Sequence, residues 1–211
     1  MATKLSDDIE LLTHSHSTKR RSAAKRIRKL GDVAAGPALV AALQEELNDD
    51  RTWETQYQMV MAIGHCQYTD ALPFVETLVP RKLGGMIDVA IGDTLFRLSR
   101  KHENDAERAI ELVIDAENKS LAQGAMQAVA MLRMVPDESI IQRLVQHGLS
   151  LDLGDDDWTV IWLLRAAPGW PDQIVEPLLE KWCDIPFSKQ QQIHGAVELA
   201  QKQKYAKWTP L

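Results

Sequence analysis

A recurring apolar pattern, with a period of 32 to 35 residues, constrains this sequence more than any other feature. Ile27 and Leu30 are followed 33 positions later by Val60 and Ile63. The pattern returns four more times, at Leu95 and Leu98, Val129 and Leu132, Ile161 and Leu164, and Ala196 and Leu199. Such a period is typical of stacked structural repeats, each too small to bury its own apolar side chains. We therefore expect a row of similar units that pack on their neighbours.

A second apolar segment lies between successive copies of this pattern. These segments start near Gly36, Thr69, Asn104, Asp137 and Pro171. Their first residues suit a helix start, and apolar residues follow at i, i+3, i+4 and i+7, as in an amphipathic helix. Val, Ile and Thr never alternate strictly with polar residues, which argues against a sheet. The sequence predicts an all-α protein, specifically a right-handed α-solenoid of about five helical hairpins with capping helices.

The predicted architecture is a single domain over residues 1–211, and its 45% hydrophobic content is enough for a substantial core. A capping helix is expected at 4–14 and a closing helix at 188–204, because the ends of a repeat stack need a polar outer face. The hairpins between them are expected at 18–48, 52–80, 84–116, 119–150 and 155–184.

The first two hairpins carry a more specific pattern. Their first helices end in Leu30-Gly31 and Ile63-Gly64, and each is followed by a small residue, Pro and Leu in close succession. The tetratricopeptide and ankyrin signatures are absent. Over about residues 18 to 80 the chain resembles short bacterial HEAT repeats, and from the third hairpin onward the resemblance rests on spacing. The resemblance implies an extended concave surface, formed mainly by the second helices of the hairpins, that holds another protein.

Charge is unevenly distributed along the chain. Residues 18–30 contain seven Lys or Arg and no acid, which leaves 17 basic and 30 acidic residues elsewhere. The candidate basic patch consists of Arg20, Arg21, Lys25, Arg26, Arg28 and Lys29. This helix could bind nucleic-acid phosphates, as a resemblance to HEAT-like DNA glycosylases would imply. The alternative is a solvated outer helix that pairs with Asp7, Asp8 and Glu10, and the acidic remainder of the chain favours it.

Acidic and aromatic residues gather in the last third of the sequence. The Asp run ahead of Trp158 suits a helix start, whereas a calcium loop is disfavoured because the Glu at its twelfth position is missing. Trp side chains anchor many protein interfaces when exposed and fill the core when buried. We predict at least one exposed Trp beside the Asp run. The candidate partner-binding residues are Asp155, Asp156, Asp157, Trp158, Trp162 and Trp170.

Residues with catalytic or metal-binding chemistry form no recognisable group. The phosphate-loop, nucleophile-elbow and H-E-x-x-H signatures are absent. Cys66 and Cys183 lie 117 positions apart and are interpreted as buried small hydrophobic residues. His65 is interpreted as a helix-terminal His favoured by the helix dipole. His102-Glu103 is the one His-Glu pair, whereas HEAT-like di-iron hydroxylases need several. We predict no catalytic residue, metal or cofactor.

The sequence thus favours a non-catalytic scaffold or chaperone-like adaptor that binds a protein. Two alternatives remain: a nucleic-acid-binding protein that uses the basic helix, and a lyase or lyase subunit for a prosthetic group, which needs an exposed reactive Cys or a conspicuous cavity. No apolar run approaches the roughly 18 residues of a membrane span, and isolated cysteines suit a reducing compartment. A cytoplasmic location without a membrane partner is expected.

Overall fold

The computed structural model describes residues 4–115, 118–152, 154, 157–185 and 191–207. Every regular element in these ranges is a helix or a helical turn, and none is a strand. The predicted all-α class is therefore confirmed. The chain divides into two compact units, residues 1–99 and 100–210, each with its own internal packing.

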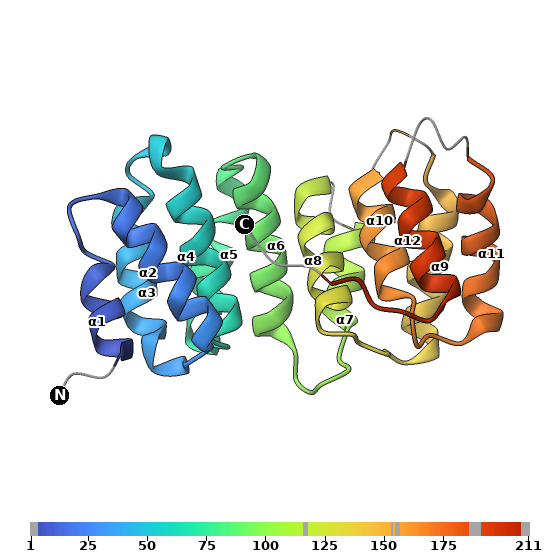
Figure 1. Cartoon of the computed structure of the whole chain (residues 1–211), viewed down its shortest axis with the longest axis horizontal. Coiled ribbons are helices and arrows are strands. Elements are labelled where there is room, and N and C mark those ends of the chain that lie inside the picture. The colour runs from blue at the N-terminus through green and yellow to red at the C-terminus, as the bar shows by residue number, and fades with distance from the viewer. Residues whose placement is uncertain (1–3, 116–117, 153, 155–156, 186–190, 208–211) are drawn as a thin grey trace. The chain divides into compact units, whose positions relative to one another are not determined.

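The first unit is built around three helices that lie side by side. Its helices are α1 (Lys4–Leu11), α2 (Ser17–Leu30), α3 (Gly36–Glu46), α4 (Trp53–His65), α5 (Leu72–Glu76) and α6 (Gly85–Ser99). Short 3-10 turns at Val33–Ala35, Asp50–Thr52, Thr69–Ala71 and Val79–Arg81 lead into α3 to α6. Figure 1 shows α4 between α2 and α6, while α1 packs against α2, α3 against α4 and α5 against α6.

The burial of α4 reflects its position at the centre of this unit. All residues from Thr55 to Gly64 are buried, because α4 has neighbours on several sides. In α2, by contrast, Ala23, Ala24 and Ile27 form one buried stripe, and most of the remaining surface is polar. The first apolar position of each repeated pair, as at Ile27 and Val60, is thus a core position, whereas the second is not always buried, because Leu30 is 49% exposed.

Gly31 and Gly64 serve different purposes, although the sequence places both at a helix end. Gly31 follows α2 in a left-handed conformation, with φ of 65°, and its amide donates to the Ile27 carbonyl. Gly64 lies inside α4, where a Cβ atom would approach Thr94 Oγ1 to 2.8 Å and Thr94 Cα to 3.0 Å. Gly64 lies one residue before the end of α4 at His65, close to where the sequence places a helix end, and it also permits the close approach of α6.

A group of polar side chains is enclosed between α2, α4 and α6. Arg97 Nε donates to Asp93 Oδ1 at 2.5 Å, and both side chains are buried. Burial, together with the nearby charge of Arg97, lowers the pKa of His65 to about 4. The prediction that His65 is helix-terminal is correct, but its environment disfavours the charged form that a helix dipole would favour.

The second unit contains the remaining helices. They are α7 (Glu107–Ile110), which continues as a π-helix at Glu111–Asp115, then α8 (Lys119–Met131), α9 (Glu138–Ser150), α10 (Asp157–Ala166), α11 (Asp172–Cys183) and α12 (Gln191–Gln201). In Figure 1, α10 lies between α8 and α12. α9 packs against α11, and α11 also contacts α12.

The predicted repeats relate to these units in a simple way. The first helices of the first two hairpins correspond to α2 and α4, and those of the last two to α8 and α10. The predicted hairpin at 84–116 combines α6 with α7, and these helices belong to different units. That hairpin, and the single domain over 1–211, stay predictions.

Candidate functional site: an acidic groove between α11 and α12

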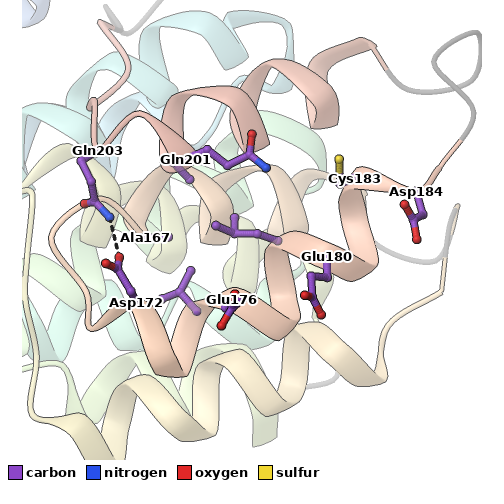
Figure 2. Close-up of a pocket in the computed structure, with 11 residues that line it drawn as sticks. Ala167, Asp172, Glu176, Glu180, Cys183, Asp184, Gln201 and Gln203 are labelled. Atoms are coloured by element: carbon purple, nitrogen blue, oxygen red, sulfur yellow. Dashed lines mark hydrogen bonds between the residues drawn. The ribbon is translucent and has the colours of Figure 1, made fainter.

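A groove with a cavity volume of about 720 Å³ lies on the second unit. One wall is α11, and the other is formed by the end of α12 and the residues that follow it (Figure 2). Ala167, just after α10, contributes to the lining. The groove is therefore built from helices of one unit and from residues that directly follow them.

The carboxylates of this groove come from the spacing of α11. Asp172, Glu176 and Glu180 recur every four residues, and Asp184 follows at the helix end. Residues four apart lie on the same face of a helix, one turn above the other. Figure 2 shows these four side chains along one edge of the groove. The opposite face of α11 is apolar, and it buries Val175, Leu178 and Trp182.

No cation neutralises this acidic row in the part of the chain that the structure describes. The carboxylates of Glu176, Glu180 and Asp184 form neither hydrogen bonds nor ion pairs with described residues. The one Lys of α11, Lys181, points elsewhere, because its Nζ donates to the backbone carbonyls of Leu149 and Leu151 at 2.7 and 2.5 Å. The carboxylates are exposed and can accept hydrogen bonds from a ligand.

The floor of the groove is apolar. Ala167, Val175 and Ala200 are buried, and Leu179 is half-buried. A ligand that covers this floor removes apolar surface from water, which is favourable in proportion to the area covered. The groove thus combines a hydrophobic base with a negatively charged edge.

Gln203 links the two walls at one end of the groove. Its backbone is left-handed, with φ of 51°, and its backbone N–H donates to the Ala200 carbonyl. This turn ends α12. Its side chain then reaches α11, where Nε2 donates to Asp172 Oδ1 at 3.0 Å (Figure 2). Its Oε1 accepts from the Gly169 amide at 2.7 Å. These bonds hold Asp172 in place.

An exposed thiol also lines the groove. Cys183, the last residue of α11, is exposed beside Glu180 and Asp184, so the prediction that it is buried is wrong. The helical period explains this result: Trp182 takes the buried position next to it. Cys66 is buried as predicted, and burial raises the pKa of its thiol to about 11.

The predicted Trp cluster is divided between core and surface. Trp162 and Trp170 are each 2% exposed, and Trp170 Nε1 donates to the Met134 carbonyl at 2.8 Å. Trp158 at the start of α10 is 46% exposed. Burial removes Trp162 and Trp170 from any partner surface, so these two predicted binding residues belong to the core. A binding role for Trp158 stays a prediction.

The exposure of the predicted binding residues Asp155, Asp156 and Asp157 is not described by the structure. Asp155 and Asp156 lie outside the described residues. Asp157 begins α10, as expected for a residue at a helix start, but its side chain is also outside the description. Their predicted partner-binding role stays a prediction.

Much of the predicted basic patch is already engaged within the first unit. Three residues of the patch form ion pairs: Arg20 with Glu46, Arg21 with Glu54 and Arg26 with Asp8. Arg20 makes two bonds to its carboxylate, of 2.5 and 2.8 Å, and donates to the His14 carbonyl. Arg28 is buried, and burial lowers its pKa. Lys25 and Lys29 are exposed and have no partner among the described residues.

The sequence contains the signal for the groove, but not for its shape. Glu176 and Glu180 stand out as acidic residues of a predicted second helix, and the four-residue spacing places them on one face. That α12 forms the other wall depends on tertiary packing, which the spacing does not reveal.

Two broader properties follow from the described residues. Their His, Cys, Asp and Glu side chains include no group of three or more that could hold a metal ion. None of the described helices has the length and the apolar content needed to cross a membrane.

Comparisons with known proteins give distant structural similarity. No family model matches the sequence, and no curated protein matches it. A crystal structure of an engineered protein is similar with a TM-score of 0.44 and 17% identity, over 95% of this chain and 100% of that chain. A second engineered protein gives a TM-score of 0.42 and 17% identity, over 97% and 99%. Similarity at this level assigns neither a family nor a function.

Proposed function

We propose that this protein is a non-catalytic binding module that holds a cationic, amphipathic segment of a partner protein in the groove between α11 and α12. The row formed by Asp172, Glu176, Glu180 and Asp184 above an apolar floor supports this proposal. A segment with Lys or Arg on one side and apolar residues beside them fits both features. Charge sets the rate of encounter, and apolar burial prolongs the bound state.

The spacing of the carboxylates favours a helical segment. Residues four apart on α11 are separated by about 6 Å along the axis, since a helix rises about 1.5 Å per residue. A partner helix that presents Lys or Arg at i, i+4 and i+8 has the same spacing. From Asp172 to Asp184 the acidic row extends over about 18 Å, which corresponds to roughly three turns of such a helix. This is the helix-in-groove mode of peptide recognition.

We also propose that the helices form a solenoid of HEAT-like hairpins. The side-by-side order of α2, α4 and α6, and of α8, α10 and α12, supports stacking within each unit. In such an architecture every repeat contacts its neighbours, and surfaces on successive helices become extended binding sites. The groove would then be the recognition surface of the last hairpin and closing helix.

The groove proposal is tested with a synthetic helical peptide. The probe carries Lys at i, i+4 and i+8 with Leu at the neighbouring positions, and a second peptide has the same composition in scrambled order. Binding is measured by calorimetry at about 20 mM and about 500 mM salt. The proposal predicts that the ordered peptide binds more tightly than the scrambled one and that salt weakens its binding.

A double substitution locates the binding surface. An exposed ion pair contributes about 0.2–1 kcal/mol, so Glu176→Gln with Glu180→Gln should weaken binding roughly 2- to 30-fold at low salt. Glu103→Gln with Glu138→Gln is the matched control, because both residues are exposed in the second unit and neither lines the groove. Equal loss in both double variants would show that general charge, and not the groove, attracts the peptide.

The exposed thiol favours a second candidate function. Cys183 lies in the groove and satisfies the requirement of a prosthetic-group lyase for an accessible Cys beside a cavity. Mass spectrometry of the protein isolated from its native cells tests this candidate. A covalent adduct on Cys183 would support it, and unmodified Cys183 would leave the binding module as the better explanation.

A further inference from the structure

We infer that the groove binds helix α2 of a second copy of this chain. The inference rests on the proposed function and names the partner for the same groove. It comes from a second surface on the molecule, the exposed side of α2, whose charge, spacing and apolar margins match those of the groove.

The exposed side of α2 carries cations with the required spacing. Lys25 and Lys29 are four residues apart, both are exposed, and neither has a partner among the described residues. Arg21 precedes them by four residues and is partly exposed, although it pairs with Glu54. The cations therefore repeat every 6 Å or so along α2, as the carboxylates do along α11.

Exposed apolar side chains stand beside these cations. Leu30 and Val33, at the end of α2 and just beyond it, are 49% and 54% exposed. Trp53 is 42% exposed and lines a small pocket of the first unit together with Arg21 and Lys25. Large exposed apolar residues near a row of cations form an amphipathic surface. Such a surface can cover the apolar floor of the groove while its Lys side chains meet the acidic edge.

Internal ion pairs leave this surface available. Arg20 and Arg26 face Glu46 and Asp8, which fixes α2 against its neighbours in the first unit. On the exposed side of α2, Lys25 and Lys29 take no part in such pairs with described residues. Because each copy carries one α2 surface and one groove, the contact is heterologous, and it leads to head-to-tail chains or closed rings.

Sedimentation of the full-length chain tests the inference. At about 20 mM salt, the weight-average mass should rise above 23.7 kDa as protein concentration increases, and at about 500 mM salt it should return to the monomer value. Variant one carries Lys25→Glu and Lys29→Glu, and variant two carries Glu176→Lys and Glu180→Lys. Each variant alone brings like charges together and should associate at least tenfold more weakly than the wild type.

Mixing the two variants gives the decisive result. In an equimolar mixture, the acidic α2 of variant one meets the basic groove of variant two, and the two unaltered surfaces also match, so association should return. Circular dichroism and thermal unfolding establish that both variants are folded. A wild type that stays monomeric at low salt, or folded variants whose mixture does not associate, would overturn the inference.

The synthetic peptide separates this inference from the proposed function. If the wild type binds the peptide in the groove but copies do not associate, the groove binds a different cationic protein and the inference is wrong. If neither peptide binding nor association is seen, the proposed function is wrong as well.

Discussion

Gly64→Ala tests the close packing of α4 against α6 in the first unit. In an open helical position, Gly to Ala stabilises a protein by about 0.5–1 kcal/mol, because Ala has the higher helix propensity. At Gly64 the new methyl group would lie 2.8 Å from Thr94 Oγ1 and 3.0 Å from Thr94 Cα. The backbone atom cannot rotate away, so α4 and α6 must separate.

The expected cost is larger than the gain in helix propensity. Thr94 Oγ1 donates to the Val60 carbonyl at 2.8 Å, and a displaced hydroxyl would lose this bond, at a cost of about 1 kcal/mol. Overpacking adds about 1–3 kcal/mol. After subtraction of the propensity gain, we expect a net destabilisation of about 1–3 kcal/mol.

Urea unfolding followed by circular dichroism measures this effect. Gly195→Ala is the matched control, because Gly195 lies within α12 and a Cβ there meets nothing within 4 Å. The control should be as stable as the wild type or slightly more stable, by up to about 1 kcal/mol. If Gly64→Ala is stabilised as much as Gly195→Ala, the close approach of α4 and α6 is refuted.

Three further predictions concern burial and charge. The pKa of His65 is lowered to about 4, below its unfolded value of 6.5, so the unfolded state binds the proton first and stability falls as pH decreases from 6.5 to 4. This loss amounts to roughly 3 kcal/mol, and it should be absent from His65→Gln when unfolding is measured across that range. Arg20→Ala should destabilise the fold by about 2–4 kcal/mol, because it leaves a buried carboxylate unpaired, whereas Lys25→Ala should change the unfolding free energy by less than about 0.5 kcal/mol. Trp170→Phe should lower the free energy of unfolding by about 1–3 kcal/mol, because the buried side chain loses a hydrogen bond and volume. Trp158→Phe changes an exposed side chain and should lower it by less than about 0.5 kcal/mol. Equal unfolding midpoints for the two variants would contradict the difference in burial between Trp158 and Trp170.

Local patterns in the sequence predict helices and buried stripes, because both depend on residues three and four apart. Ile27 and Val60 are core residues for this reason, and both are fully buried. Contacts between helices follow no such local rule. Gly64 has the sequence context of a helix end but is required for helix packing, and its role depends on Thr94, 30 residues away.

In the candidate site, too, the sequence predicts the local arrangement of residues but not the contacts between helices. The periodicity places Glu176 and Glu180 on one face of a helix, and this much follows from the sequence. The groove itself requires α12 beside α11, and this arrangement brings together residues far apart in the chain. The Trp residues show a further limit of sequence-based prediction. The sequence does not tell which Trp is buried, and in the structure Trp158 is exposed whereas Trp170 lies in the core.

Protection of the Cys183 thiol by the bound peptide is the most direct measurement of the groove proposal. Cys183 is exposed in the groove, and Cys66 is buried and serves as an internal reference. With saturating ordered peptide at low salt, we expect native-state labelling of Cys183 to slow by about fivefold or more, since the segment covers the thiol. The scrambled peptide, at the same concentration, should leave the rate unchanged. If the ordered peptide binds at saturation and Cys183 is labelled as fast as before, the cationic segment does not lie between α11 and α12.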